Sequence, residues 1–141
     1  MKINKVVVIG SGTMGSGIAA HLCNANVPVT LLDLTTEISQ KAKERIQKSR
    51  PPLLIDKSKI DGINIGNIND DFKEVADADW IVEAVVERID IKHNIYKKIF
   101  DTRKKTPSYP QIHPLYQLAF YLKNYPKKIK KTFVLHIFLI L

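Results

Sequence analysis

The chain has one cysteine, no long apolar run and no signal-peptide pattern. A lone Cys23 excludes an internal disulfide, and its helical spacing of four from Ala19 indicates a small core residue rather than a reactive thiol. No run of about 18 uninterrupted apolar residues exists, so a membrane span is not expected. At the start, Met1–Ile9, the apolar run is only Val6–Ile9 and no cleavage site follows. These absences predict a cytoplasmic protein, and 141 residues predict little more than one domain.

Positive charge is in excess, but only in one part of the chain. Residues 1–100 contain 14 Lys and Arg against 13 Asp and Glu, whereas residues 101–141 contain 8 against 1. Four of the five tyrosines also lie in the second part. The net charge of +8 therefore belongs to a tail and forms no predicted face, which argues against a specific nucleic-acid partner. We predict a domain over residues 1–100 and a poorly structured tail over 101–141.

Hydrophobic patterning in the first part alternates between strand and helix. A short β-branched run before a glycine-rich turn is typical of a strand buried on both faces of a parallel sheet, and helical spacing begins at Thr13. The expected strands are Lys5–Ile9, Val27–Leu32, Ile63–Ile68 and Trp80–Val86. The first expected helix begins at Thr13. The other expected helices are Ser39–Lys48, Asp71–Ala76 and Ile89–Ile99, and a linker is expected over residues 51–62. This order predicts an α/β fold, an incomplete doubly wound parallel sheet of the Rossmann type.

One glycine motif, G-x-G-x-x-G, lies between the first strand and the first helix. Gly10 allows the tight turn, Gly12 lets backbone approach a pyrophosphate, and Gly15 lets the helix pack close to the sheet. The diphosphate would sit on the helix N-terminus, where unpaired amides and the helix dipole favour an anion. The predicted cofactor-binding residues here are Gly10, Ser11, Gly12, Thr13, Met14 and Gly15. A lone motif of this kind is common, so its flanking strand and helix carry the assignment.

An acidic residue follows at the end of the second strand. Asp33 lies 18 residues after Gly15, near the spacing of about 20 at which a carboxylate accepts hydrogen bonds from the adenosine ribose. Its negative charge would repel a 2′-phosphate, so NAD is predicted in preference to NADP. The alternative for Asp33 is a helix N-cap or turn residue.

Three segments together make the chain resemble the 3-hydroxyacyl-CoA dehydrogenase family, as found in fatty-acid oxidation proteins. They are Val7–Ala19, Leu31–Asp33 and Asp79–Arg88, and the last makes the resemblance specific. The resemblance implies that Glu87 and Lys92 line the nicotinamide side of the NAD site; the alternative is an ordinary solvated pair at a helix start. Glu83 is expected to be structural. The implied reaction is oxidation of an L-3-hydroxyacyl-CoA to the 3-ketoacyl-CoA in β-oxidation, with hydride transfer to NAD.

The family continues with segments that this chain does not spell. It uses a His within His-Phe-Phe-Asn-Pro as the base, a Glu that orients it, and a helical substrate domain. Codons permitted for residues 107–117, read from their third base, can spell the family's Ile-Ile-Ser-Ser-Asn-Thr-Ser-Thr-Ile-Pro. The same offset over residues 134–141 permits Ile-Thr-His-Phe-Phe-Asn-Pro. We therefore predict a frameshift near residues 101–106, which the DNA sequence would test.

The frameshift hypothesis decides how the remaining histidines are interpreted. His136 lies almost where the family's base would be, but its neighbours differ, so it is not assigned as catalytic. His21 and His93 are predicted on helix surfaces and His113 in the tail. We name no catalytic residue and no metal ligand. The apolar end, residues 133–141, is suited to pairing with an exposed sheet edge and predicts poor solubility.

Several functions remain open from the sequence. The first is an inactive fragment of a 3-hydroxyacyl-CoA dehydrogenase that keeps part of the NAD site. The second is an NAD-binding module that acts with a separate chain carrying the substrate domain. A different Rossmann enzyme, such as a sugar-acid dehydrogenase, is disfavoured by Trp80–Arg88, and a nucleic-acid-binding protein comes last.

Overall fold

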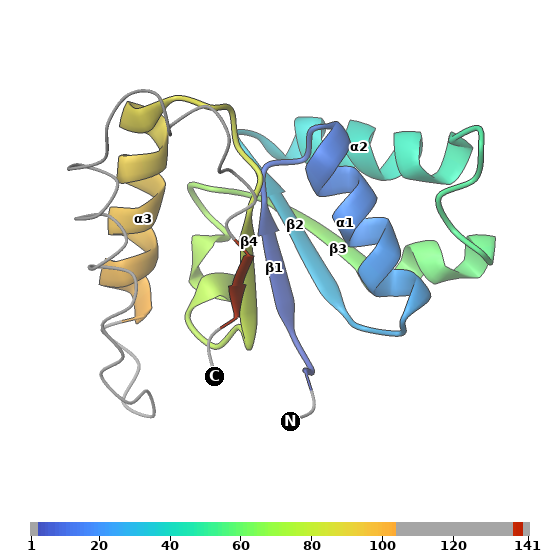
Figure 1. Ribbon diagram of the computed structural model, residues 1–141, viewed down its shortest axis with the longest axis horizontal. Coiled ribbons are helices and arrows are strands. Elements are labelled where there is room, and N and C mark those ends of the chain that lie inside the picture. The colour runs from blue at the N-terminus through green and yellow to red at the C-terminus, as the bar shows by residue number, and fades with distance from the viewer. Residues whose placement is uncertain (1–2, 104–136, 140–141) are drawn as a thin grey trace.

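The computed structural model describes residues 3–103 and, for the backbone alone, residues 137–139. Its order is β1 (Val6–Ile9), α1 (Thr13–Asn24), β2 (Val29–Asp33), α2 (Thr36–Lys48), the 3-10 helix η1 (Lys57–Gly62), β3 (Ile63–Asn67), the 3-10 helix η2 (Phe72–Val75), β4 (Trp80–Glu83), α3 (Ile89–Arg103) and β5 (Ile137–Leu139). The sheet order is β3-β2-β1-β4-β5 (Figure 1). The strands β1 to β4 are mutually parallel, as predicted for a Rossmann-type sheet, and β5 is antiparallel to β4.

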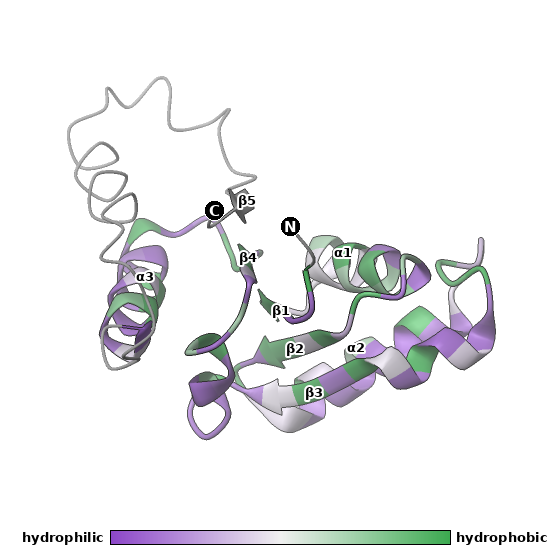
Figure 2. Cartoon of the chain, turned by 90° about the horizontal axis from the view of Figure 1, so that it is seen from below, coloured by the Kyte–Doolittle hydropathy of each residue, from purple (hydrophilic) through white to green (hydrophobic). Residues whose placement is uncertain are grey.

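The sheet is buried on both faces by helices. Val6 and Val8 of β1 pack into a cluster with α1 and α2, whereas Val7 and Ile9 pack into a second cluster with η2 and α3. Successive residues of a strand point to opposite faces, and helices cover both faces, so all four side chains are fully buried. Figure 2 shows α1 and α2 on one side of the strands and α3 on the other. This two-sided burial explains why β1 lacks polar residues.

Turn and cap chemistry shifts several predicted boundaries. The helix α2 begins at Thr36 rather than Ser39, because the Thr35 hydroxyl caps it by accepting a bond from the Ile38 N–H at 3.4 Å. The strand β2 begins at Val29 rather than Val27, since the Val27 N–H still bonds the Leu22 carbonyl at the end of α1. A linker was expected over residues 51–62, but Lys57–Gly62 form η1, capped by the Asp56 carboxylate.

The second half of the domain also differs from expectation in length. The strand β4 ends at Glu83 rather than Val86, and the brief helix predicted over residues 71–76 is the 3-10 turn η2. The helix α3 runs to Arg103, four residues beyond Ile99, and the buried Arg103 guanidinium donates to the carbonyls of Val75 and Ala78 at 3.0 and 2.9 Å. These bonds anchor the C-terminal turn of α3 to η2 and to the segment between η2 and β4.

Two further expectations concern burial and membranes. Cys23 is 3% exposed within the α1 cluster, as predicted for a core residue, and burial raises the pKa of its thiol. In the described ranges, no helix combines the length and apolar character needed to cross a membrane. The Ile137–Leu139 backbone lies along the β4 edge, the kind of edge pairing expected for the apolar end of the chain. His113 and His136 lie outside the described residues.

Candidate functional site

The turn after β1 brings the glycine loop against the start of the segment after β4. Gly10 has a φ of 102°, and a Cβ placed on it would lie 2.5 Å from the Ala84 carbonyl oxygen. The Ala84 N–H donates to the Ile9 carbonyl at 2.7 Å, which holds the two segments together. Gly10 therefore meets both demands that favour glycine, a left-handed backbone and a close backbone approach.

The other two glycines of the motif have opposite surroundings. A Cβ on Gly15 would lie 1.9 Å from the Gly10 carbonyl oxygen, so α1 can begin this close to the loop only without a side chain there. A Cβ on Gly12 would meet no described atom within 4 Å. Gly12 therefore has no neighbour in residues 3–103 that requires glycine, and its bare backbone faces open space.

The N-terminus of α1 is uncovered next to Gly12. Gly12 is the N-cap, provides no side-chain bond to the helix amides, and no acidic residue lies in the first turn. Thr13 and Met14 are exposed, whereas Gly15 and Ser16 are buried. The first amides of a helix have no intrahelical acceptor, so this end presents free N–H donors together with the positive end of the helix dipole.

Asp33 connects the end of β2 to the glycine loop. Its Oδ2 accepts bonds from the Ser11 N–H at 2.7 Å and the Ser11 hydroxyl at 2.6 Å, and its Oδ1 accepts from the Leu34 N–H at 2.7 Å. The carboxylate is half-buried, and it does not cap α2, whose N-cap is Thr35. Of the two alternatives to a ribose role, the helix cap is thus wrong, and the turn contact through Leu34 is present.

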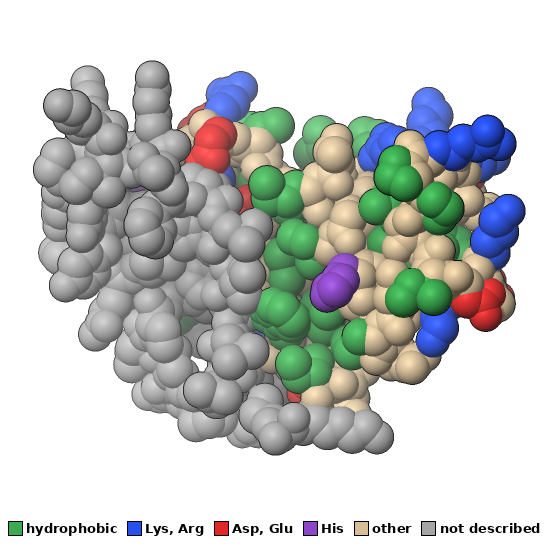
Figure 3. Space-filling view, turned by 45° about the vertical axis from the view of Figure 1, so that its right-hand side comes forward, with side chains coloured by type: hydrophobic (Ala, Val, Ile, Leu, Met, Phe, Trp, Pro, Cys, Tyr) green, Lys and Arg blue, Asp and Glu red, His purple; other side chains and the backbone are tan. Residues whose placement is uncertain are grey.

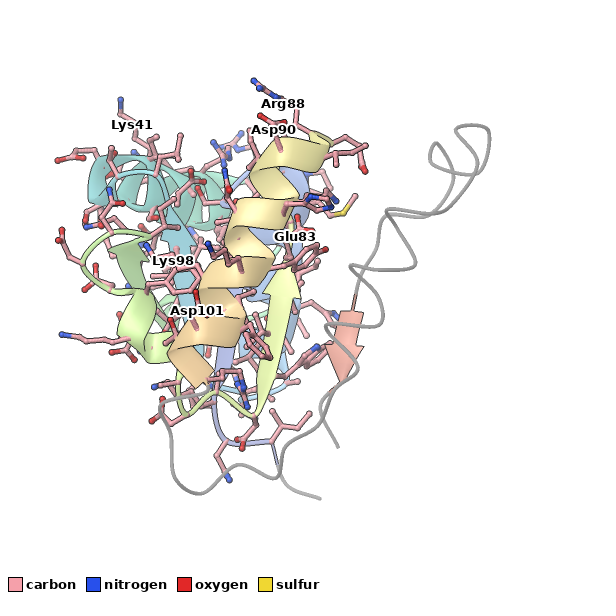
Figure 4. All side chains as sticks on the ribbon, turned by 90° about the vertical axis from the view of Figure 1, so that its left-hand side faces the viewer. Lys41, Glu83, Arg88, Asp90, Lys98 and Asp101 are labelled. Carbon is pink, nitrogen blue, oxygen red and sulfur yellow. The ribbon has the colours of Figure 1, made fainter. Side chains whose placement is uncertain are left out.

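A second group of charged residues lies where β4 ends and α3 packs on the sheet. The Lys92 ammonium lies 3.2 Å from Oε2 of Glu83 and 3.5 Å from Oε1 of Glu87. The Lys92 and Glu83 side chains are 9% and 1% exposed, whereas Glu87 is 58% exposed. Figure 4 shows Glu83 at the end of β4, beside α3. The fold thus brings the predicted pair Glu87 and Lys92 together and adds Glu83 as the buried counter-charge.

Tyr96 completes this group and was not singled out from the sequence. Its hydroxyl donates to Oε2 of Glu83 at 2.8 Å, and Glu83 also accepts the Val85 N–H through Oε1 at 2.8 Å. Burial, and next the negative charge of Glu83, raise the pKa of Tyr96. The signal available in the sequence was the spacing of four between Lys92 and Tyr96, which puts both on one face of α3.

Several large apolar side chains are exposed near the glycine loop and the end of β4. Met14, Leu34, Val86 and Ile89 are each more than half exposed and follow the carboxyl ends of β1, β2 and β4. Figure 3 shows Lys and Arg side chains gathered over α2 and the loop after it.

His21 and His93 lie exposed on α1 and α3, as predicted. No group of three metal-ligating side chains occurs in the part of the chain described by the structure.

A family model and several known proteins match the same part of the chain. The family model described as 3-hydroxyacyl-CoA dehydrogenase, NAD binding domain, matches residues 5–106. A probable 3-hydroxyacyl-CoA dehydrogenase of Deinococcus radiodurans is 41% identical over 113 residues, which cover 75% of this chain and 33% of that protein. A putative fatty acid oxidation complex trifunctional enzyme of Rickettsia felis is 39% identical over 144 residues, covering 95% of this chain and 20% of the relative.

A solved structure agrees with these matches. The 3-hydroxybutyryl-CoA dehydrogenase from Escherichia coli superposes with a TM-score of 0.61 at 25% identity, covering 72% of this chain and 23% of the other. The chain therefore spans about a third or less of each of these relatives.

Proposed function

This chain belongs to the 3-hydroxyacyl-CoA dehydrogenase NAD-binding-domain family, and we propose that its glycine loop binds the diphosphate of NAD. The observation that carries the proposal is the difference between the three glycines. Gly10 and Gly15 are required by the protein's own backbone, whereas Gly12 faces open space beside the uncovered N-terminus of α1. A bare backbone that no protein neighbour explains, when it lies at an uncovered helix N-terminus, is expected where an anionic ligand approaches closely.

The adenosine ribose is proposed to bind at Asp33. Its carboxylate stands at the carboxyl end of β2, next to the loop, and three N–H and O–H donors already fix its orientation. A carboxylate oriented in advance accepts ribose hydroxyls without further ordering, and its charge disfavours a 2′-phosphate. The exposed Leu34 beside it supplies apolar surface for the adenine ring.

The nicotinamide side is proposed to lie at Glu87 and Lys92. Support comes from their position after β4, whose carboxyl end meets that of β1 at the same edge of the sheet. The buried Glu83 holds the Lys92 ammonium at this edge, and the exposed Glu87 leaves one side of the pair open. When bound, the oxidised nicotinamide would supply the hydride acceptor.

The substrate is proposed to be a 3-hydroxyacyl-CoA, as in the relatives' names. Its oxidation needs a base that takes the proton of the C3 hydroxyl while the hydride leaves C3. Within residues 3–103 the histidines lie exposed on helix surfaces, and we propose that this part binds NAD without catalysing the oxidation. The base and the acyl-CoA surface would come from a substrate domain, for which a separate chain is the second candidate.

We propose a cytoplasmic location for the chain. The single cysteine is buried and unpaired, so no disulfide of the described domain calls for an oxidising compartment.

A substitution at Gly12 tests the cofactor site. Gly12→Ser places a side chain in space that is open in the free protein, and serine is a preferred N-cap, so the melting temperature should not fall. The NAD dissociation constant, measured by calorimetry, should rise about tenfold to a hundredfold, as expected for about 1–3 kcal/mol of overpacking.

Gly17→Ala is the matched control for this test. Gly17 lies on the same helix with equally open surroundings but outside the glycine loop, so NAD affinity should stay unchanged. Equal NAD affinity in Gly12→Ser and the wild-type chain would refute the proposed diphosphate site.

A further inference from the structure

Arg45 of α2 reaches across to the glycine loop and contacts its backbone. Its Nη2 donates to the Ser11 carbonyl oxygen at 2.7 Å and lies 3.2 Å from the Ser16 hydroxyl. The Ser16 hydroxyl donates to the same carbonyl oxygen at 2.9 Å. Across residues 3–103, no ion pair joins Arg45 to a carboxylate. The strongest contact of this guanidinium is therefore with one peptide oxygen of the loop.

That oxygen belongs to the peptide between Ser11 and Gly12. A trans peptide is planar, so its C=O and its N–H point in opposite directions. Two side-chain donors draw the Ser11 oxygen toward Arg45 and Ser16, and the Gly12 N–H must point away from them. In the described part of the chain the Gly12 N–H has no hydrogen-bond acceptor, and the space beyond a Gly12 Cβ is open.

This peptide needs an external restraint. Glycines stand on both sides of Ser11, and glycine permits backbone rotations that other residues resist. A rotated peptide would turn the Ser11 carbonyl oxygen, in place of an N–H, toward the diphosphate, and the two would repel. The amide and hydroxyl of Ser11 are held by Asp33, so only the carbonyl side depends on α2.

We infer that Arg45 is a positioning residue, which holds the Ser11 carbonyl so that the Gly12 N–H faces the diphosphate of NAD. This inference rests on the proposed function. A guanidinium suits the task because its bonds to oxygen are charge-assisted, and about twice as strong as those between neutral groups. Ser16, buried beneath the loop, provides the second restraint on the same oxygen.

The test compares three variants of the full chain with two ligands. Arg45→Met removes the cationic donor, and Ser16→Ala removes the neutral donor without changing charge. Lys41→Met removes a cation from the same helix at a site that points into solvent (Figure 4). ADP-ribose contains the diphosphate, and adenosine lacks it.

For ADP-ribose we expect the dissociation constant to rise about tenfold in Arg45→Met and about threefold in Ser16→Ala, as for a lost charge-assisted and a lost neutral bond. Lys41→Met should leave it unchanged. Adenosine, followed by NMR titration, should bind all variants equally, because the Asp33 side of the loop is intact. In the free protein, the Gly12 amide resonance should move in Arg45→Met far more than that of Leu34.

Three results would overturn the inference. Unchanged ADP-ribose binding by Arg45→Met would mean that the loop needs no such restraint. Equal losses for ADP-ribose and adenosine would indicate a general structural role, and an equal loss in Lys41→Met would indicate a bulk charge effect. If the wild-type chain binds neither NAD nor ADP-ribose, the proposed function fails, while the Gly12 resonance of the ligand-free chain still decides whether Arg45 orients the peptide.

Discussion

At the scale of single residues, a glycine motif separates into positions with different physical tasks. Gly10 and Gly15 are constrained by backbone atoms at 2.5 and 1.9 Å from an added Cβ, and Gly12 has no such constraint. The sequence predicted these three roles from the G-x-G-x-x-G spacing together with its position between a predicted strand and a predicted helix. Ser11 links the loop to β2 and to α2. Its amide and hydroxyl donate to Asp33 at the end of β2, and its carbonyl accepts from Arg45 of α2.

Asp33 carries a prediction about coenzyme choice. Asp33→Asn keeps the shape of the side chain, removes its charge and replaces one acceptor oxygen by an NH2 donor, which weakens the bonds it would accept from ribose hydroxyls. We expect NAD affinity to fall about tenfold, the lower end of the effect of a hydrogen bond to a charged group. NADP should lose less, because the charge that repels its 2′-phosphate is gone. Parallel calorimetric titrations with NAD and NADP measure both changes.

Asp61→Asn serves as the charge control for this prediction. Asp61 is exposed on η1 and lies away from the loop, so both affinities should match the wild type. An unchanged ratio of NAD to NADP affinity in Asp33→Asn would show that this carboxylate does not select the coenzyme.

At the scale of elements, β4 and α3 are joined by a buried polar group as well as by apolar packing. Glu83 at the end of β4 accepts from Tyr96 and pairs with Lys92, two residues one helical turn apart on α3. Ile95 and Ile99 pack beside them against the sheet. Removal of one member of a buried charge pair costs about 3–5 kcal/mol, since the other is left unpaired. The contact therefore fixes how α3 is placed on β4.

Tyr96 gives a prediction about stability at high pH. Its folded-state pKa is raised above the ordinary value of 10.0, so the unfolded chain loses this proton at a lower pH than the folded chain does. The contribution of Tyr96 is complete below pH 10.0 and falls as the pH rises from there toward the folded-state pKa. We expect the wild-type free energy of unfolding to fall more between pH 8 and pH 11 than that of Tyr96→Phe, as measured by urea denaturation.

The wild type and Tyr96→Phe contain the same lysines. The effect of lysine titration on stability therefore cancels when their free energies of unfolding are compared. At pH 8 Tyr96→Phe should be less stable by about 1.5–3 kcal/mol, the usual contribution of a hydrogen bond to a charged group. Identical pH dependence in the two proteins would show that the Tyr96 phenol is not held in its neutral form by the fold.

At the scale of the whole molecule, the parallel sheet order β3-β2-β1-β4 places the predicted site residues together at the carboxyl ends of the strands. The carboxyl ends of β1, β2 and β4 meet there, and they lead into the glycine loop, Asp33 and the Glu83 group. Beside β4 the fifth strand is antiparallel, so the parallel arrangement of strands stops at β4. The described domain thus gathers the predicted cofactor-binding residues at the carboxyl ends of its parallel strands.

A prediction about activity belongs to this scale. The 141-residue chain should bind NAD yet form no NADH from 3-hydroxybutyryl-CoA, because the two histidines within residues 3–103 are exposed on helix surfaces and neither is assigned as the base. NADH absorbance measures turnover, and calorimetry of the same sample verifies binding. The Deinococcus radiodurans relative, assayed in parallel, serves as the positive control. Turnover by the 141-residue chain comparable to that control would contradict the assignment.

The residue sequence was enough to predict the α/β class, a parallel sheet of the Rossmann type and the glycine loop with Asp33 at the end of the second strand. These follow from local rules, because strand and helix periodicity, turn glycines and a fixed spacing along one βαβ unit are all short-range properties. Element ends were less predictable where a side chain such as Thr35 or Asp56 caps the backbone.

The distant side chains that contact the site residues became apparent only in the folded molecule. Arg45 lies 34 residues from Ser11, and Tyr96 lies 13 residues from Glu83, so no local pattern joins either pair. Such contacts depend on how α2 packs beside α1 and how α3 packs on β4. That packing is set by the burial of whole apolar faces, which the order of residues within a single element does not specify.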